Sequence, residues 1–288
     1  MTGMSAVIVT YNSRAHVPAC LDSLRAHCPD AEVVAVDNAS ADGTPELIAR
    51  DYPWVRLIAR TTNAGLSAGV NEGVAASGGS CVVVLNPDVR FDHDVLSPLA
   101  AYLREHADVG VVAPKLLDDD GTLQLSCRAF PGYSTAFFNR YSALTRLFPG
   151  NRASSRYLMS DFDHASVRDV DWLSGAALMF PRALFDVLGG WDAGFFLFNE
   201  DVDFCRRVHD AGYRVVYDPE VAVYHRIGIS TSAAPRVIIE RHKSMWRYYR
   251  KHLRGNFLRD AVTGAGIATR CGYVLAMSGA RKLAGRAR

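Results

Sequence analysis

Short apolar runs alternate with helix-like segments through the first hundred residues, and this alternation restricts the fold more than any other feature of the sequence. Continuous apolar runs are typical of parallel strands that are buried on both faces. We expect strands at 5–11, 31–40, 55–60 and 80–88, with helices between them at 13–28, 43–52 and 65–77. This order predicts an α/β fold with a mostly parallel central sheet and helices on both faces.

Polar side chains gather where the expected strands end. They are Thr10, Tyr11 and Asn12 after the first strand, Asp37 and Asn38 after the second, and Asn86 and Asp88 after the fourth. Open parallel sheets bind ligands at the carboxyl ends of their strands. The first strand runs into "NSRAH" without a glycine, so the GxGxxG turn of a dinucleotide-binding fold is absent. A nicotinamide enzyme is therefore disfavoured.

The composition is that of a soluble globular protein, with 49% apolar and 22% charged residues. The six cysteines form no CxxC pair and no Cys/His cluster, which favours a reducing cytosol and argues against a zinc site. The N-terminal residues show no secretory signal. No window holds 18 uninterrupted apolar residues, so no membrane-spanning helix is expected.

The regular alternation stops in the second half of the chain. Residues 123–169 are aromatic and basic without clear periodicity, which indicates a loop-rich insertion with one or two short helices. Residues 170–190 predict a strand, a turn at Pro181 and a short helix, and 213–225 predict a hairpin-like pair of strands. The pattern then becomes helical. We divide the chain into two halves of the α/β body and a helical region, at 1–113, 114–228 and 229–288.

The net charge of +2 conceals a strongly basic C-terminal region. Residues 236–288 contain 13 Lys and Arg and two acids, a charge of +11, which leaves −9 for the rest. The basic residues alternate with Trp246, Tyr248, Tyr249 and Phe257, a mixture typical of a helix on an anionic membrane surface. A solvated helix is the alternative. No RNA-binding signature accompanies the basic residues, so no nucleic-acid partner is expected.

Several of the polar strand ends fit the binding of a phosphorylated ligand. Asp88 could hold a divalent cation such as Mg²⁺, which takes one or two carboxylates together with substrate phosphate oxygens. Asp37 could accept hydrogen bonds from a ribose or a nucleobase, and Asn63 and Gly65 enter a helix whose free amides could face a phosphate. Turn formation at the two aspartates and close helix packing at the glycine are the alternatives.

Three acids, Glu200, Asp201 and Asp203, follow an aromatic run, and they could cap a helix, bind a metal or supply a catalytic base. A helix from here to Gly212 would place its apolar residues on one inward stripe. At 100° per residue, Asp201 and Asp203 are then about 200° apart and cannot share a target. Asp203 has arginines at i+3 and i+4, at 206 and 207, so we expect it to form a salt bridge.

The motifs "VIVTYN", "VVAVDNASADGT", "NAGLSAGVN", "LNPDV", "GGWDAGFFLFNEDVDFCRRVHDAGY" and "YH", in this order, resemble family 2 inverting glycosyltransferases of the Rossmann-like GT-A fold. The bacterial rhamnosyltransferases are the most similar branch, and the resemblance covers about residues 4–252. It implies that residues 1–113 are a nucleotide-sugar-binding half and 114–228 an acceptor-binding and catalytic half. It also implies that the nucleotide sugar is bound by Thr10, Tyr11, Asn12, Asp37, Asn63, Gly65, Asn86 and Asp88.

The resemblance also implies a metal and a base. Asp88 and His225 would hold Mg²⁺ or Mn²⁺, although Asn86 stands where many members carry the first aspartate of a DxD motif. Asp201 would deprotonate the acceptor hydroxyl, and the charge of Glu200 would raise the pKa of Asp201. We expect acceptor contacts from Trp172, Trp191, Asp192 and Glu200, because sugar rings stack on aromatic faces; core packing is the alternative for the tryptophans.

The predicted function is transfer of a sugar, rhamnose from dTDP-rhamnose, to a polyprenyl-diphosphate-linked or other cell-envelope glycan. The basic helical extension would hold the enzyme on the inner face of the cell membrane, in the cytoplasm. A UDP-sugar-dependent galactofuranosyl- or hexosyltransferase is the alternative within the enzyme class. A catalytically silent sugar-nucleotide-binding partner is the alternative outside it, because Asn86 removes one metal-binding charge.

Overall fold

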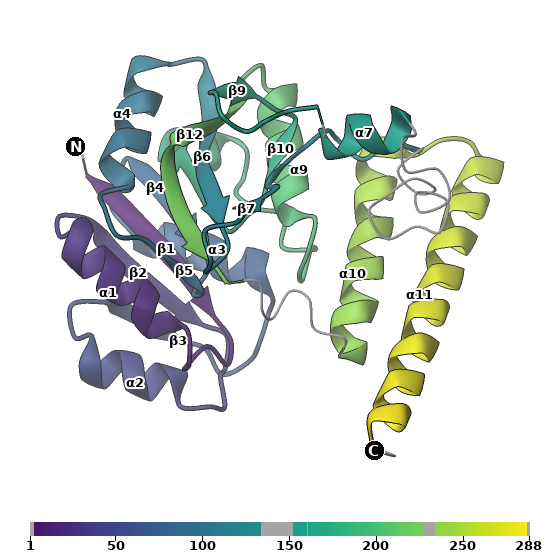
Figure 1. Ribbon diagram of the computed structural model, residues 1–288, viewed down its shortest axis with the longest axis horizontal. Helices are drawn as coiled ribbons and strands as arrows, with labels where there is room; N and C mark the ends of the chain where they lie inside the picture. Colours follow the sequence, from purple (N-terminus) through teal and green to yellow (C-terminus); the bar gives the residue numbers. More distant parts are fainter. Residues whose placement is uncertain (1–2, 134–151, 160, 227–233, 287–288) are drawn as a thin grey trace.

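The computed structural model describes residues 3–133, 152–159, 161–226 and 234–286. A large mixed sheet with helices on both faces forms the body, and two C-terminal helices stand beside it (Figure 1). The central sheet has the strand order β3-β2-β1-β4-β11-β6-β12-β5. In chain order its strands are β1 (Met4–Thr10), β2 (Glu32–Asp37), β3 (Arg56–Ala59), β4 (Cys81–Leu85), β5 (Val89–Arg90), β6 (Val109–Leu117), β11 (Ala177–Pro181) and β12 (Arg214–His225).

Four short strands complete the β-structure of the described residues. Strand β7 (Leu123–Gln124) pairs with β6, and β9 (Arg168–Asp169) pairs with β12. Strands β8 (Cys127–Arg128) and β10 (Trp172–Leu173) form a separate antiparallel pair. They lie in or next to the segment that was expected to be a loop-rich insertion. The helix expected there is α7 (Arg152–Leu158), while residues 134–151 lie outside the described part.

Helices cover both faces of the sheet, as the alternating sequence predicts. Alternate residues of β1 point to opposite faces, so that Ala6 and Ile8 belong to one core cluster and Val7 and Val9 to the other. The first cluster is covered by α1 (Val17–His27), α2 (Thr44–Asp51) and α4 (Leu96–Glu105). The second is covered by α3 (Leu66–Ala76), α8 (Arg182–Val187) and α9 (Glu200–Asp210).

Strands β3, β2, β1 and β4 are parallel, which brings their polar ends to one edge of the sheet. Strand β11 then runs antiparallel between β4 and β6. The two expected halves of the body therefore share one sheet, and the division at residue 113 stays a prediction. Strand β11, the turn into α8 and the two glycines that follow the helix agree with the sequence prediction.

The expected hairpin at 213–225 is wrong. Residues Arg214–His225 form one long strand that pairs with β6 in parallel, with a register shift between Asp218 and Ala222. The Asp218 side chain accepts the amide N–H of Glu220 across this irregularity, at 3.0 Å. The residues around Pro219 therefore make a bulge and not a reversal, and the strand carries on to His225 at the polar edge.

The C-terminal region is helical, as predicted. It consists of α10 (Pro235–Tyr248), a π-helical turn η2 (Tyr249–Leu253) and α11 (Phe257–Arg286). The Trp246 ring stacks on Tyr249 at 5.5 Å and lies against Gly264, which joins α10 to α11. Helix α10 stands between the body and α11 (Figure 1). Within the described residues, no helix is long and apolar enough to cross a membrane.

Candidate active site

The first two strands end in a buried hydrogen-bonded pair. Thr10 and Asp37 are in register, and the Thr10 hydroxyl donates to the Asp37 carboxylate at 2.7 Å. The same carboxylate accepts the amide N–H and the hydroxyl of Ser40, so that Asp37 also organises the turn after β2. Tyr11 beside this pair is 42% exposed and available to a ligand. Asn12 adopts a left-handed conformation with φ 51°, and its side-chain oxygen accepts the Ala41 N–H at 2.9 Å.

The first amide N–H groups of α3 form hydrogen bonds within the protein. Asn63 accepts the Gly65 N–H at 2.9 Å, and the carbonyl of Phe196 accepts the Leu66 N–H at 2.8 Å. Gly65 has φ +93°, and a Cβ there would lie 2.5 Å from the Phe196 oxygen. These two amide N–H groups are therefore already hydrogen-bonded within the protein. The contact with Phe196, which the sequence does not reveal, joins α3 to the aromatic loop before α9.

Asn86, Asp88 and His225 meet at the polar edge of the sheet. His225 ends β12 and pairs with Val89 of β5, which places its ring beside the loop after β4. The Asp88 Oδ1 and Asn86 Nδ2 atoms each lie 3.4 Å from His225 Nε2. Asp88 Oδ1 is buried and has no hydrogen-bond partner among the described residues.

Gln124 holds the far side of the His225 ring. It lies on β7, and its side-chain oxygen is 3.0 Å from His225 Nδ1. Its nitrogen donates to the Asp118 carboxylate at 2.6 Å and to the His225 carbonyl at 2.5 Å. Gln124 sits in the aperiodic segment, 101 residues from His225, so sequence reasoning missed it.

These residues fit a divalent cation whose coordination is completed by substrate. An unpartnered carboxylate oxygen beside an imidazole nitrogen is a suitable donor pair for Mn²⁺ or Mg²⁺. No cluster of three or more His, Cys, Asp or Glu suited to a metal occurs among the described residues. Asp88 and His225 would therefore need phosphate oxygens of a nucleotide to complete the site, which is common for Mg²⁺.

Asp201 begins the second part of the site, in the first turn of α9. Its two carboxylate oxygens accept the amide N–H groups of Gly175 at 2.9 Å and Val202 at 2.8 Å. Burial raises the pKa of Asp201 above its ordinary value, and these hydrogen bonds only partly oppose that effect. A Cβ at Gly175 would lie 3.3 Å from the Asp201 Cβ, so a small residue is needed here.

Glu200 precedes Asp201 and is 5% exposed. Burial raises the pKa of Glu200 well above its ordinary value, and the negative charge of Asp201 raises it further. Repulsion between two neighbouring carboxylates is mutual, so the expected effect of Glu200 on the pKa of Asp201 stays a prediction.

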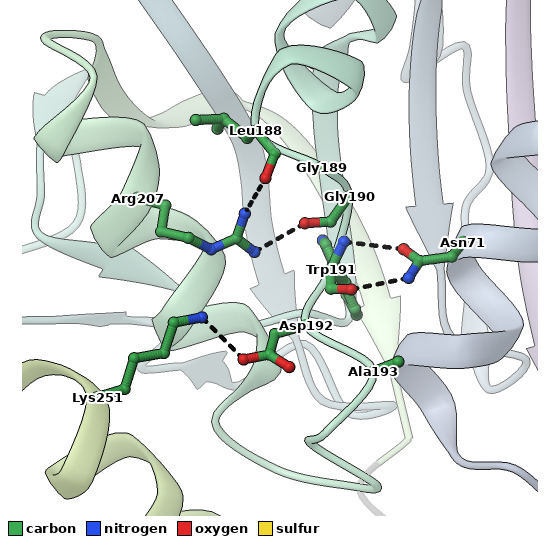
Figure 2. A pocket seen from close by; sticks show the side chains of 9 residues that line it. All are labelled: Asn71, Leu188, Gly189, Gly190, Trp191, Asp192, Ala193, Arg207 and Lys251. Atoms are coloured by element: carbon green, nitrogen blue, oxygen red, sulfur yellow. Dashed lines mark hydrogen bonds and ion pairs between the residues drawn. The ribbon is translucent and has the colours of Figure 1, made fainter.

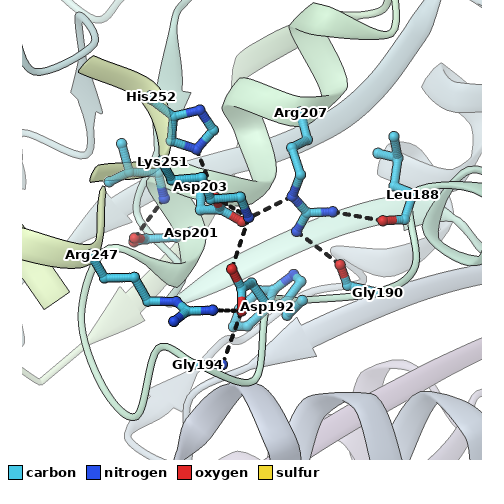
Figure 3. A network of polar contacts seen from close by, with 12 residues as sticks. Leu188, Gly190, Asp192, Gly194, Asp201, Asp203, Arg207, Arg247, Lys251 and His252 are labelled. Atoms are coloured by element: carbon cyan, nitrogen blue, oxygen red, sulfur yellow. Dashed lines mark hydrogen bonds and ion pairs between the residues drawn. The ribbon is translucent and has the colours of Figure 1, made fainter. Parts of the chain in front are cut away.

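Asp203 faces away from Asp201 and is fully buried in a basic network (Figure 3). It accepts Arg207 Nε at 2.9 Å, Lys251 Nζ at 2.7 Å and His252 Nε2 at 2.7 Å. Burial raises the pKa of Asp203, but the hydrogen bonds from His252 and Lys251 outweigh it and hold the pKa below its ordinary value. The i+4 salt bridge is confirmed, whereas Arg206 pairs with Asp210 and not with Asp203.

Asp192 belongs to the same network and not to a free acceptor surface. Its carboxylate is bound by Arg247 at 2.6 Å and Lys251 at 2.8 Å, and it accepts the Gly194 N–H at 2.9 Å. Burial opposes ionisation of Asp192, but these contacts hold its pKa far below the ordinary value. Lys251 thus bridges Asp192 and Asp203, a link between η2 and the catalytic half that sequence reasoning missed.

A polar cavity of about 380 Å³ lies beside this network (Figure 2). Asn71 exchanges two hydrogen bonds with the main chain of Trp191, at 2.7 and 2.8 Å. The Trp191 side chain is 1% exposed and packs near Phe204, so the expected sugar-stacking face at Trp191 is wrong: the ring is part of the core. Trp172 is partly buried and donates its Nε1–H to the Ala129 carbonyl at 2.9 Å.

The aromatic loop 195–198 connects Asp192 to α9 and packs against α10 and η2. Cationic side chains lie over its rings at 4.4 to 5.9 Å: Arg236 over Phe196, Arg241 over Phe198, and Arg247 and Lys251 over Phe195. The Ser244 hydroxyl donates to the Leu197 carbonyl at 2.8 Å. Phe198 and Asn199 both have positive φ, at 71° and 63°. Such strained non-glycine residues cluster at functional sites.

Comparison with known proteins identifies the class of enzyme to which this arrangement is similar. The model of glycosyl transferase family 2 matches residues 5–162, more than half of the chain. The chain is also similar to the N-acetylglucosaminyl-diphospho-decaprenol L-rhamnosyltransferase of Mycobacterium tuberculosis. The two are 30% identical over 268 residues, which cover 85% of this chain and 86% of the relative.

Two solved structures share the fold. The mannosyltransferase of Pyrobaculum calidifontis in complex with GDP-Man and Mn²⁺ is similar with a TM-score of 0.58 and 19% identity, over 99% of this chain and 75% of that chain. GalNAc-T7 with UDP, GalNAc and Mn²⁺ is similar with a TM-score of 0.61 and 14% identity, over 86% and 48%. Likeness at this identity shows the fold alone, and it confirms the expected GT-A architecture.

Proposed function

The chain belongs to glycosyl transferase family 2 and is a glycosyltransferase, and from this premise we propose that it transfers a sugar from a nucleotide-sugar donor to a polyprenyl-diphosphate-linked glycan, with Asp201 as the general base. Inversion, the course typical of the family, is a single displacement. The acceptor hydroxyl attacks the anomeric carbon while the nucleoside diphosphate leaves. The hydroxyl must lose a proton, and the leaving diphosphate carries negative charge.

The environment of Asp201 is the observation that carries this proposal. Two amide N–H groups hold its carboxylate in place, and each oxygen keeps a lone pair for a substrate proton. A carboxylate whose pKa is raised by burial is a stronger base toward a hydroxyl near neutral pH. Burial also raises the pKa of Glu200 beside it, which favours the uncharged form of that carboxyl group.

Asp88 and His225 are proposed to bind the metal and, through it, the donor diphosphate. A bound Mg²⁺ or Mn²⁺ would neutralise the charge that develops on the leaving diphosphate. Asn86 lies at the same imidazole nitrogen and supplies a neutral group where an aspartate would add a charge. The site therefore relies on substrate phosphate oxygens more than a site with two aspartates would.

The proposed substrates follow the similarity to the mycobacterial relative, which is an L-rhamnosyltransferase acting on N-acetylglucosaminyl-diphospho-decaprenol. We infer dTDP-rhamnose as the donor and a polyprenyl-diphosphate-linked acceptor of the same class. A UDP-sugar is the alternative donor. Thr10, Tyr11, Asn12 and Asp37 at the ends of β1 and β2 would hold the nucleoside, with Tyr11 as the exposed member of the set.

The C-terminal helices are proposed to rest on the anionic inner face of the cell membrane, where such an acceptor is found. Tyr248 and Tyr249 are buried, so they are not interfacial as expected from the sequence. Helix α11 instead exposes Phe257 and a stripe of Leu258, Val262, Tyr273 and Met277. At 100° per residue the four members of the stripe fall within about 100° of the helix surface. One apolar face on a basic region is typical of an interfacial helix.

A transfer assay with matched variants tests this function. Purified full-length chain is incubated with dTDP-rhamnose or UDP-sugars and a short polyprenyl-diphosphate acceptor, with and without Mn²⁺. Asp201→Asn should reduce kcat at least about a hundredfold, because general-base catalysis contributes about 10² to 10⁴, while nucleotide affinity measured by calorimetry stays within twofold. Asp210→Asn, an exposed acid on the same helix, is the control. Full activity of Asp201→Asn would remove the base assignment, and absence of transfer from every donor would favour a silent binding protein.

A further inference from the structure

We propose that Gln124 is a positioning residue of the metal site: it fixes His225 in the tautomer that turns a lone pair of Nε2 toward Asp88. This inference rests on the proposed metal site, of which it names a further member. Gln124 touches neither metal nor substrate. It acts through the ring of His225, from strand β7, which pairs with β6 on the side opposite to β12.

The orientation of the Gln124 amide follows from its partners. One end of the amide contacts the Asp118 carboxylate and the His225 carbonyl, at 2.6 and 2.5 Å. Both contacted atoms are acceptors only, so the end that meets them must be the NH₂ group with its two donors. The other end, which faces His225 Nδ1 at 3.0 Å, is therefore the oxygen. The hydrogen-bond partners therefore decide which end of the Gln124 amide is the nitrogen and which is the oxygen.

The tautomer of His225 follows in turn. An amide oxygen can only accept, so His225 Nδ1 must carry the proton that it donates to Gln124. In the neutral ring Nε2 is then unprotonated: it can accept a hydrogen bond from Asn86 Nδ2 at 3.4 Å, and Asp88 Oδ1 lies at the same distance. That carboxylate oxygen has no hydrogen-bond partner among the described residues. A lone pair and a carboxylate oxygen that face each other repel, and a cation placed to contact both would remove this repulsion.

The consequence is a preorganised pair of metal ligands. Without Gln124 the neutral ring can protonate Nε2 and donate a hydrogen bond to Asp88, which would occupy both ligands and compete with the metal. Removing the hydrogen-bond partner of a metal-ligating histidine typically costs 10- to 100-fold in metal affinity. Gln124 should therefore matter for cation binding even when no sugar is transferred.

Mn²⁺ binding to the full-length chain in the presence of a nucleoside diphosphate tests the proposal, with free Mn²⁺ measured by electron paramagnetic resonance. Gln124→Met keeps the length of the side chain and removes the acceptor, so affinity should fall 10- to 100-fold. Asp118→Asn is the control: its amide oxygen can still accept the Gln124 nitrogen and the Gln124 oxygen stays toward Nδ1, so affinity should stay within threefold of the wild type. Equal loss in both variants would show that the acceptor at Nδ1 has no special role and would overturn the proposal.

Nitrogen-15 spectra of the imidazole groups in metal-free protein read the tautomer directly. His225 should be protonated at Nδ1 in the wild type, and Gln124→Met should shift it toward Nε2 protonation; an Nε2-protonated ring in the wild type would overturn the inference. Asp88→Asn is measured in parallel. If Asp88→Asn leaves Mn²⁺ affinity unchanged, the metal site itself fails. If Asp88→Asn loses affinity while Gln124→Met does not, only the role of Gln124 fails.

Discussion

Asp201 and Asp203 face opposite sides of helix α9, although a single residue separates them. Asp201 is held by the amides of Gly175 and Val202, and burial raises its pKa. Asp203 is enclosed by Arg207, Lys251 and His252, which lower its pKa against the effect of burial. One helical turn thus carries a carboxylate suited to accept a proton and another that stays ionised. The second attaches the C-terminal helices to the catalytic half.

Replacing Asp203 should destabilise the fold in a pH-dependent way. Asp203→Asn leaves the cations Arg207 and Lys251 around a neutral side chain, and breaking a buried ion pair costs about 3–5 kcal/mol. Because the pKa of Asp203 is lowered in the folded protein, its stabilisation is present above the ordinary value near pH 4 and is lost as the pH falls through the lowered value. Urea unfolding at pH 7 and at progressively lower pH measures the difference, which should shrink with acidification.

Asp210→Asn is the matched control for that experiment. Asp210 pairs with Arg206 on the surface of the same helix, with the same i+4 spacing, and such exposed pairs contribute about 0.3–0.5 kcal/mol. The free energy of unfolding of Asp210→Asn should therefore stay close to the wild-type value at every pH. Similar effects of the two substitutions would contradict a special role for the buried network.

Gly65→Ala should destabilise the fold. Gly65 has φ +93°, and an added Cβ would lie 2.5 Å from the carbonyl oxygen of Phe196. Gly121 also has a positive φ, +83°, but nothing within 4 Å of its Cβ position, so Gly121→Ala measures the cost of a positive φ without a steric contact. That cost is about 1–3 kcal/mol. The loss of unfolding free energy in Gly65→Ala, measured by urea unfolding, should exceed this cost. Equal losses would mean that the contact between α3 and the aromatic loop carries no energy.

The parallel part of the sheet could be predicted because its strands are continuous apolar runs between helices. That same pattern places Thr10 and Asp37 side by side, where the structure finds a hydrogen bond. The single strand that ends at His225 could not be predicted, because the residues around Pro219 resemble a turn and only pairing with β6 makes them a bulge. Local sequence preference was overruled by the partner strand.

Gln124 and Lys251 show the other limit of sequence reasoning. Gln124 lies on a two-residue strand in a segment without periodicity, and its partner is 101 residues away. Lys251 is one of many cations in a basic tail, a composition that indicates a solvated or membrane-facing helix. Its contacts with Asp192 and Asp203 arise only when η2 packs against the catalytic half. No local pattern encodes contacts of this range.

Glu200→Gln should stabilise the protein at alkaline pH. The raised pKa means that folded Glu200 keeps a proton that the unfolded chain releases near pH 4.3, so stability falls as the pH rises from there through the raised value. Glutamine cannot ionise and avoids this loss. The variant should therefore melt at a higher temperature than the wild type at pH 9 and at the same temperature at pH 4. Glu46→Gln, an exposed acid in the first turn of α2, should show neither effect.

The apolar face of α11 should govern binding to anionic vesicles. Phe257 and Leu258 are 88% and 70% exposed at the start of the helix, and burying such side chains contributes about 1.5–3 kcal/mol each. Replacing both with serine should reduce sedimentation with phosphatidylglycerol vesicles at least tenfold in affinity, while transfer to a short water-soluble acceptor stays near the wild-type rate. Val187→Ser removes a side chain that is 82% exposed on α8, in the body, and should bind vesicles like the wild type. If the Val187 variant loses as much vesicle binding as the α11 variant, the membrane contact is not confined to the C-terminal helices. If neither variant loses vesicle binding, the proposed membrane contact through α11 is wrong.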